Sequence, residues 1–258
     1  MRIDGLLLDI DGVLAVSWEP IPGSIEALAA FRGAGLPVCL ITNTTTHTRA
    51  GLAQILGDAG FDIEPSEIVT AVTATADYVR VMYPGASVFV LSDGDATDDM
   101  RDLALVDRAA DADIVALGGA SADFSYPAMN DVFRRLMDGA PLIAMHRNLY
   151  WKTAGGWELD AGAYVAGLEA AAATEAVVCG KPSAAYFRSA LDLLGLPAER
   201  TAMVGDDIVN DVEGARAAGL TGILVRTGKY RESDLSRGTP DVVVDSLADV
   251  PALLDIGR

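Results

Sequence analysis

Two aspartates near the start of the chain, Asp9 and Asp11, are spaced so that both carboxylates can act on one ligand. They follow the apolar residues 6–8, a run typical of a strand buried on both faces of a parallel sheet. Side chains alternate along a strand, so the two carboxylates point the same way if the chain stays extended. Carboxylates this close repel each other unless a proton or a cation neutralises the pair. The pattern indicates a cation site, or else a strand that ends in a polar turn at Gly12.

Polar side chains also follow three further apolar runs, at residues 38–41, 176–179 and 201–204. After these runs come Thr42 and Asn43, then Lys181, and finally Asp206, Asp207 and Asp211. Ligands of a parallel sheet bind at the carboxyl ends of its strands, so we expect the four strand ends to converge. Oxygen ligands of this kind suit Mg²⁺, with carboxylates from Asp9 and Asp206 and a backbone carbonyl near Asp11.

The same residues suit phosphoryl chemistry. A phosphoryl group needs positive charge and hydrogen-bond donors, which Lys181, the Thr42 hydroxyl and backbone amides can supply. One carboxylate can attack phosphorus and form an aspartyl phosphate. A second carboxylic acid can protonate the leaving oxygen and then act as the base toward water.

The elements that must position these residues alternate between strands and helices. Such alternation predicts an α/β fold with a doubly wound parallel-sheet, Rossmann-like core. A second series of strands and helices, with strands expected at 88–91, 114–117 and 142–145, predicts an inserted smaller α/β domain. We expect residues 1–75 plus 176–258 to form the core domain and residues 76–175 to form the insertion.

Composition narrows the functional class. The chain has 258 residues, 51% of them hydrophobic, and no apolar run as long as a membrane span. The net charge of −18 repels nucleic acid and anionic membranes, so neither is an expected partner. The two cysteines, Cys39 and Cys179, lie in apolar runs without zinc-type spacing, and the chain runs straight into its first strand without room for a signal peptide. These features favour a cytoplasmic protein.

Four motifs in this order resemble those of the haloacid dehalogenase superfamily of phosphohydrolases. They are Leu8-Asp9-Ile10-Asp11-Gly12, Ile41-Thr42-Asn43, Gly180-Lys181-Pro182 and Gly205-Asp206-Asp207 through Asp211. The insertion between the second and third motifs resembles the αβ cap of the NagD-type subgroup. The later stretches 124–126, 129–130, 180–183, 203–209 and 225–231 are most similar to the phospholysine phosphohistidine inorganic pyrophosphate phosphatase group.

This resemblance implies roles for the residues of the first and third motifs. Asp9 would be the nucleophile and a metal ligand. Asp11 would be the general acid and base, with its backbone carbonyl on Mg²⁺. Lys181 would neutralise the charge of the nucleophile and of the phosphoryl group.

The second and fourth motifs would complete the site by the same resemblance. Thr42 and Asn43 would contact the phosphoryl group, and Asp206 would ligate Mg²⁺. Asp207 and Asp211 would lie outside the ligand shell and orient metal-bound waters or the lysine. The implied partner is a small phosphorylated substrate, and related proteins suggest a homodimer through the cap.

Several alternatives stay open at this point. A phosphomutase would use the same first motif but return the phosphoryl group to its substrate. A non-catalytic phosphate-binding module would keep the fold without the catalytic activity. The pair Asp11 and Asp206 argues against a dehalogenase, which needs neither an acid nor a metal. His146, Tyr150 and Trp151 could line a substrate pocket or pack in the insertion, and the loop at Lys229 could be structural or catalytic.

Overall fold

The computed structural model describes residues 2–153 and 156–256, with only the backbone of 151–153, and divides the chain into two compact units. The first unit contains the chain up to Thr42, Arg49–Val69 and everything from Lys181 onward. The second unit contains Asn43–Thr48 and Thr70–Gly180.

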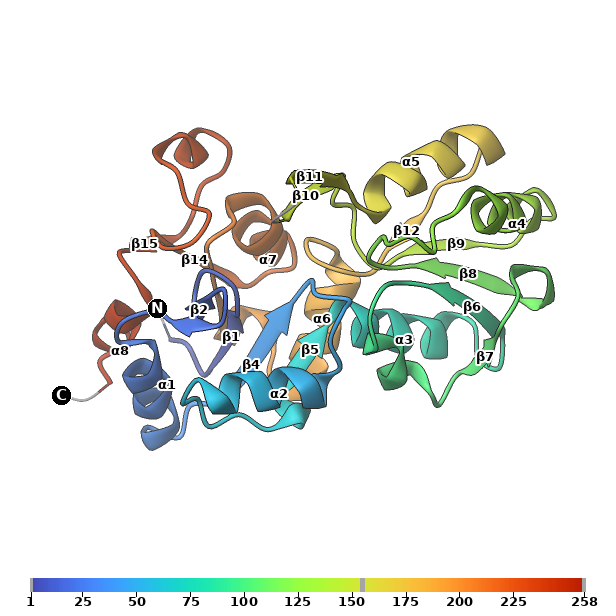
Figure 1. Ribbon diagram of the computed structural model, residues 1–258. Coiled ribbons are helices and arrows are strands. Elements are labelled where there is room, and N and C mark those ends of the chain that lie inside the picture. Colours follow the sequence, from blue (N-terminus) through green and yellow to red (C-terminus); the bar gives the residue numbers. More distant parts are fainter. Residues whose placement is uncertain (1, 154–155, 257–258) are drawn as a thin grey trace. The chain divides into compact units, whose positions relative to one another are not determined.

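A six-stranded sheet forms the centre of the first unit, in the order β15-β14-β13-β1-β4-β5 (Figure 1). The strands are β1 (Gly5–Asp9), β4 (Val38–Thr42), β5 (Ile68–Thr70), β13 (Thr201–Gly205), β14 (Thr221–Val225) and β15 (Val242–Val244). The pairs from β15 through β4 are all parallel. This arrangement confirms the predicted α/β fold with a parallel core sheet. The short antiparallel pair β2 (Ala15–Val16) and β3 (Glu19–Pro20) follows β1.

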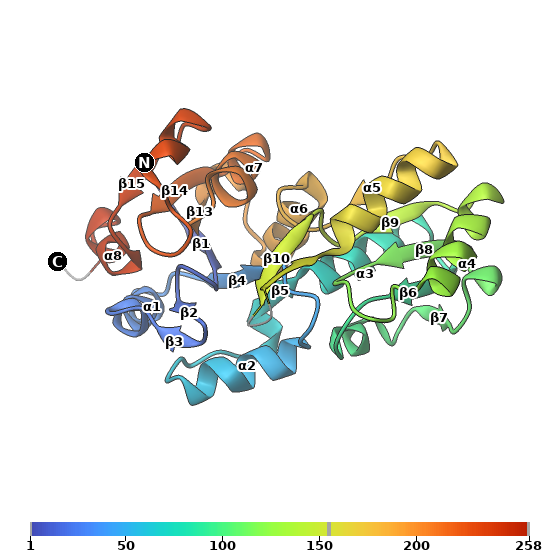
Figure 2. The ribbon, with the colours of Figure 1, turned by 45° about the horizontal axis from the view of Figure 1, so that its top comes forward.

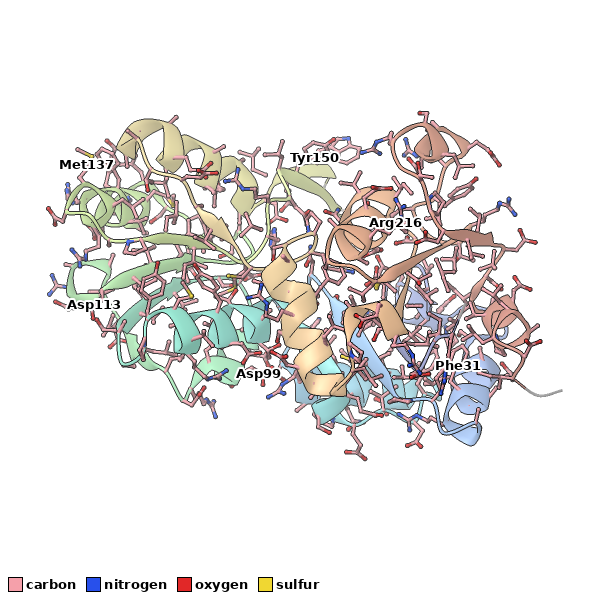
Figure 3. The ribbon with its side chains drawn as sticks, turned by 180° about the vertical axis from the view of Figure 1, so that it is seen from behind. Phe31, Asp99, Asp113, Met137, Tyr150 and Arg216 are labelled. Atoms are coloured by element: carbon pink, nitrogen blue, oxygen red, sulfur yellow. The ribbon has the colours of Figure 1, made fainter. Side chains whose placement is uncertain are left out.

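Helices cover both faces of this sheet. Seen from behind in Figure 3, α6 and α7 lie in front of the sheet, whereas α1 and α2 lie beyond it. Leu6 and Leu8 of β1 pack with the fully buried Phe31 of α1 on the second of these faces. The helices of this unit are α1 (Ser24–Gly33), α2 (Arg49–Asp58), α6 (Ala184–Leu194), α7 (Gly214–Ala217) and α8 (Val250–Leu253), with a π-helical turn at Ile208–Glu213 and 3-10 turns at Pro65–Glu67, Ala198–Arg200, Glu232–Ser236 and Leu247–Asp249.

The second unit has its own five-stranded parallel sheet, in the order β12-β9-β8-β6-β7. Its apolar core lies between the strands β8 and β9 and the helices α4 and α5. Its strands are β6 (Ser87–Leu91), β7 (Ala104–Val106), β8 (Ile114–Leu117), β9 (Leu142–Ala144) and β12 (Val177–Val178). Its helices are α3 (Ala71–Met82), α4 (Tyr126–Met137) and α5 (Ala161–Ala172), with 3-10 turns at Ala96–Met100 and Ala109–Asp111.

Residues 43–48 belong to the second unit because they bond to loops of its sheet. The Thr45 hydroxyl accepts a hydrogen bond from the amide of Gly119 at 2.9 Å, and the carbonyl of Thr46 accepts one from Asp95 at 3.3 Å. The chain therefore leaves the first unit twice, after Thr42 and again after Val69. The expected core of 1–75 plus 176–258 included residues 43–48, 70–75 and 176–180, which lie in the second unit. The action of the second unit as a cap stays a prediction.

An antiparallel hairpin of β10 (Tyr150–Thr153) and β11 (Gly156–Leu159) adjoins the start of α5 (Figure 2). Tyr150 and Trp157 are largely exposed and meet edge to face, with ring centroids 5.5 Å apart. His146 is buried instead, and its Nδ1 accepts a hydrogen bond from the amide of Asn148. The side chain of Trp151 lies outside the described residues. Among the described helices, none has the length and apolar character needed to cross a membrane.

Candidate active site

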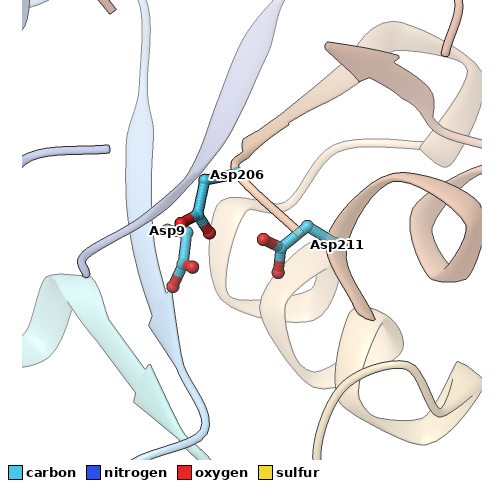
Figure 4. Close-up of side chains that lie close together, drawn as sticks. All are labelled: Asp9, Asp206 and Asp211. Atoms are coloured by element: carbon cyan, nitrogen blue, oxygen red, sulfur yellow. The ribbon is translucent and has the colours of Figure 1, made fainter. Parts of the chain in front are cut away.

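Acidic side chains gather where the central strands of the first unit end. Asp9 is the last residue of β1, and Asp206 follows the adjacent strand β13. Asp211 lies in the π-helical turn after Asp206 (Figure 4). All three side chains are buried, and each offers an oxygen within 4.8 Å of the others. Parallel strands end at one edge of a sheet, which is why residues distant in sequence meet here.

The electrostatics of this cluster favour a cation. Burial raises the pKa of Asp206 to about 7, and the neighbouring Asp9 contributes to the rise. Burial and the charge of Asp9 also raise the pKa of Asp211, although Lys181 opposes the rise. Within the described part of the chain, the buried Oδ1 of Asp206 has no hydrogen-bond partner. A buried carboxylate oxygen without a partner is costly, and a divalent ion with oxygen ligands would satisfy it.

Lys181 provides positive charge directly beside the acidic cluster. Its Nζ lies 2.8 Å from Oδ1 of Asp9 and 2.7 Å from Oδ1 of Asp211, and all three side chains are almost completely buried. Burial alone would lower the pKa of Lys181, but Asp211 and Asp9 raise it far above its usual range. The lysine is therefore a permanent cation that holds the Asp9 carboxylate in place.

A loop after β14 holds the carboxylate of Asp206. The amide of Lys229 donates to Asp206 Oδ2 at 2.6 Å, and the Thr227 hydroxyl donates to the carbonyl of Gly12 at 2.5 Å. Gly12 and Gly228 both have positive φ angles, of 92° and 64°, and a Cβ on either one would overlap the Asp206 carboxylate. Only glycine permits both this backbone conformation and this close approach.

Replacing Gly12 with alanine should lower the unfolding free energy by more than the backbone strain of alanine alone would. Alanine with a positive φ costs about 1–2 kcal/mol, and here its Cβ would also displace Asp206. Gly139→Ala is a matched control because Gly139 has a φ of 94° but open space around it. Urea denaturation of both variants measures the difference. Equal losses of unfolding free energy in Gly12→Ala and Gly139→Ala would show that the overlap with Asp206 does not affect stability.

The two expected outer carboxylates, Asp207 and Asp211, have different surroundings. Asp207 begins the π-helical turn: its Oδ1 accepts from the amides of Val209 and Asn210, and its Oδ2 accepts from the Asn210 side chain. These bonds hold the pKa of Asp207 below its usual value against the effect of burial. Asp211, in contrast, is fully buried against Lys181. Asp207 thus shapes the turn that carries Asp211 into the cluster.

The three remaining expected site residues, Asp11, Thr42 and Asn43, follow or end the strands β1 and β4. The side chain of Asp11 is exposed just after β1, where the next amide, Gly12, bonds to the carbonyl of Ala15. Thr42 ends β4 in the first unit, beside the end of β1. Asn43 belongs to the second unit, where its side chain approaches Gly180.

Two contributions to this cluster become specific only with the structure. Asp211, expected outside the ligand shell as a group that orients metal-bound waters or the lysine, has its carboxylate close to those of Asp9 and Asp206 and 2.7 Å from Lys181. The sequence also left the role of the Lys229 loop open, and the loop is bonded to Asp206 through its backbone. The Thr227-Gly228-Lys229 sequence after a buried strand was the available signal, but a backbone amide leaves no mark in residue types.

Comparisons with known proteins show the family to which this chain belongs. Residues 6–105 match the family model for haloacid dehalogenase-like hydrolases, and residues 178–250 match a second, HAD-hydrolase-like model. The bovine haloacid dehalogenase-like hydrolase domain-containing protein 2 is 38% identical over 92% of this chain and 90% of that protein. The rat phospholysine phosphohistidine inorganic pyrophosphate phosphatase is 36% identical over 98% of this chain and 94% of its own length.

Solved structures extend the likeness to the whole fold. A p-nitrophenyl phosphatase from Archaeoglobus fulgidus has a TM-score of 0.91 and 29% identity, and the match covers 98% of this chain and 100% of that one. NagD from E. coli has a TM-score of 0.88 and 28% identity, and the match covers 96% of this chain and 98% of that one. The chain therefore belongs to the haloacid dehalogenase-like hydrolases, as a NagD-type phosphatase.

Proposed function

We propose that this protein is a magnesium-dependent phosphohydrolase that cleaves small-molecule phosphate monoesters through an aspartyl phosphate on Asp9. The observation that carries the proposal is the buried cluster of three carboxylates, two of which, Asp9 and Asp211, are paired with Lys181. Pyrophosphate and phosphoamides are the alternative substrates of the same proposal, and the names of the relatives support testing them together with p-nitrophenyl phosphate. A cytoplasmic location and a homodimer through the second unit stay predictions.

The chemistry of the cluster fits a magnesium ion. Its donors are carboxylate oxygens, and the unpartnered Oδ1 of Asp206 is already buried among them. Asp9 and Asp206 would hold the ion, together with the backbone carbonyl of Asp11. When bound, the ion would neutralise charge on the transferred phosphoryl group. Asp211 is held by Lys181, so we assign it to fixing the lysine.

The proposed reaction has two balanced steps. The Asp9 carboxylate attacks phosphorus, the bond to the leaving oxygen breaks, and Asp11 donates its proton to that oxygen. Water then loses a proton to Asp11 and attacks the aspartyl phosphate, which releases inorganic phosphate and restores Asp9. The exposed side chain of Asp11 can exchange protons with solvent between turnovers.

Lys181 and Thr42 would bind the phosphoryl group during both steps. The ammonium of Lys181 already lies against the nucleophile, so no rearrangement is needed to stabilise charge that develops there. The hydroxyl of Thr42, at the end of β4 beside β1, and the Asn43 that follows would add hydrogen bonds.

Phosphate release from p-nitrophenyl phosphate, with and without Mg²⁺, tests the proposal. Metal-dependent release of one phosphate per nitrophenol supports hydrolysis. A phosphoryl group that reappears on an added acceptor, in place of free phosphate, would indicate a phosphomutase-like transferase. Absence of turnover on this compound and on the wider panel, with Mg²⁺ present, would contradict the proposal and favour a phosphate-binding module.

Magnesium should stabilise the protein increasingly as pH rises. In the folded, metal-free protein the pKa of Asp206 is about 7, compared with 3.8 for an aspartate carboxyl in its ordinary, unburied state. A carboxyl whose pKa is raised by folding stabilises the protein below its unfolded pKa, and this stabilisation is lost as pH rises through about 7. Mg²⁺ binds the ionised form, so the increase in Tm that it causes should be small at pH 5 and larger at pH 7.5. Differential scanning fluorimetry measures both values.

Asp206→Asn is the matched variant for this experiment, since it removes the titrating carboxyl and keeps its size. It should lose most of the magnesium-induced increase in Tm at pH 7.5. An equal response of the wild-type protein at both pH values would contradict the assignment of Asp206.

A further inference from the structure

The hydroxyl of Tyr186 bonds to backbone groups of two neighbouring strands, at the end of β4 and within β5. Tyr186 lies in α6, and its side chain is completely buried. Its hydroxyl oxygen accepts a hydrogen bond from the amide of Thr42 at 2.7 Å. The same oxygen lies 2.7 Å from the carbonyl of Thr42 and 2.8 Å from that of Val69, so its single proton is shared between the two carbonyls.

This hydroxyl takes the place of a strand partner. The N–H and C=O of one strand residue point to the same side, where they normally bond to the neighbouring strand. Strand β4 ends at Thr42 and its neighbour β5 ends at Thr70, so the ladder between them stops here. Without the phenol, backbone groups in this buried position would lose a partner.

The bonded residues are also the places where the chain leaves the first unit. One departure follows Thr42, the other follows Val69, and the chain returns at Lys181, ahead of the helix that carries Tyr186. Helix α6 is fixed at its start by the Ser183 side chain, which accepts from the amide of Tyr186. The tyrosine therefore ties both departing segments to a helix that begins beside the catalytic lysine.

The charge state of Tyr186 suits this role. Burial raises the pKa of its phenol well above the usual value, and the charge of Asp9 adds to the rise while Lys181 opposes it. The hydroxyl is consequently neutral and keeps its proton at pH 7. It can both accept from Thr42 and donate to a carbonyl throughout the reaction.

We propose that Tyr186 is a positioning residue whose hydroxyl fixes the Thr42 peptide, and with it the phosphate-contacting residues Thr42 and Asn43. The inference rests on the proposed function, because Thr42 and Asn43 contact a phosphoryl group only in that reaction. Tyr186 itself touches no reacting atom. Its hydroxyl sets the direction in which the chain leaves β4.

Tyr186→Phe tests this role because it removes the hydroxyl and keeps the ring. Amide hydrogen exchange, measured by NMR, should become about tenfold or more faster at Thr42. The kcat for p-nitrophenyl phosphate should fall about tenfold, the equivalent of 1.4 kcal/mol, with a smaller change in KM. A loss in kcat is expected because the phosphoryl contacts are displaced while the metal and the nucleophile stay in place.

Phe187→Leu is the control for simple destabilisation. Phe187 is equally buried and packs edge to face on Tyr186, with ring centroids 6.1 Å apart, but it carries no hydroxyl. It should loosen the core while the kcat of the folded protein stays near the wild-type value. Unchanged exchange at Thr42 in Tyr186→Phe, or equal kcat losses in the two variants, would overturn the inference. An inactive wild-type protein would refute the proposed function instead, and the exchange experiment would still decide whether the hydroxyl fixes Thr42.

Discussion

Replacing Asp9 with asparagine is expected to abolish phosphate release without unfolding the protein. Asparagine cannot form an aspartyl phosphate, so kcat should fall on the order of 10⁴-fold or more. Stability should be preserved because the substitution removes one of three buried carboxylates that lie close together, two of which share the ammonium of Lys181. Lys181 keeps its contact with Asp211 in the variant. Phosphate release and urea denaturation, measured on the same preparation, test both expectations.

The control for this variant is Asp123→Asn, a change of the same size and charge on an exposed residue. It should leave both the rate and the unfolding midpoint at wild-type values. Substantial phosphate release by Asp9→Asn would remove Asp9 as the nucleophile. A clear loss of folding stability would instead show that the Asp9–Lys181 ion pair stabilises the protein more than the carboxylates destabilise it.

The core of the fold was predictable because buried parallel strands leave continuous apolar runs. The expected strands at 38–41, 114–117 and 201–204 correspond to β4, β8 and β13. Short or exposed strands gave no such signal. β5 has three residues, and the hairpin β10–β11, whose Trp157 is exposed, was not among the expected strands. Without burial, no hydrophobic pattern marks a strand.

The candidate site was predictable as far as strand ends define it. Asp9, Asp206 and Lys181 come together because each stands at the carboxyl end of a buried run or just before the next helix. The division of roles between Asp207 and Asp211 had no such basis. It depends on a π-helical turn that points Asp211 inward and uses Asp207 as its cap. The spacing of residue types does not distinguish this turn from an ordinary helix.

The contribution of Tyr186 was invisible in the sequence for a related reason. Its aromatic ring fits the apolar face of an amphipathic helix, and that face explains the residue without any use of the hydroxyl. The hydroxyl matters only because β4 and β5 end side by side. Long-range pairing of this kind becomes known only with the structure.

Replacing Lys181 with methionine should have the largest effect on stability of any single change at the site. Methionine keeps most of the length and removes the charge, which leaves Asp9 and Asp211 buried without their ammonium. Breaking a buried ion pair on one side costs about 3–5 kcal/mol. Phosphate release should also fall by a factor on the order of 10²–10³, because the positive charge at the phosphoryl group is lost.

The loss should depend on pH with a defined sign. Burial and the charge of Asp9 already raise the pKa of Asp211 while Lys181 opposes the rise, so loss of the lysine raises this pKa further. Protonation of Asp211 at pH 5 then relieves the unpaired charge, and the charge returns when the carboxyl ionises at pH 8. Urea denaturation should therefore show a smaller loss at pH 5 than at pH 8. Addition of Asp211→Asn to Lys181→Met should recover part of the stability at pH 8, because it removes a carboxylate that has lost its partner. Lys229→Met is the comparison, because Lys229 also carries a charge that acts on Asp206 and Asp9 but its side chain reaches solvent, so its replacement should lower stability less. A pH-independent loss, or no recovery in the double variant, would mean that Lys181 stabilises the fold through packing and not through its charge.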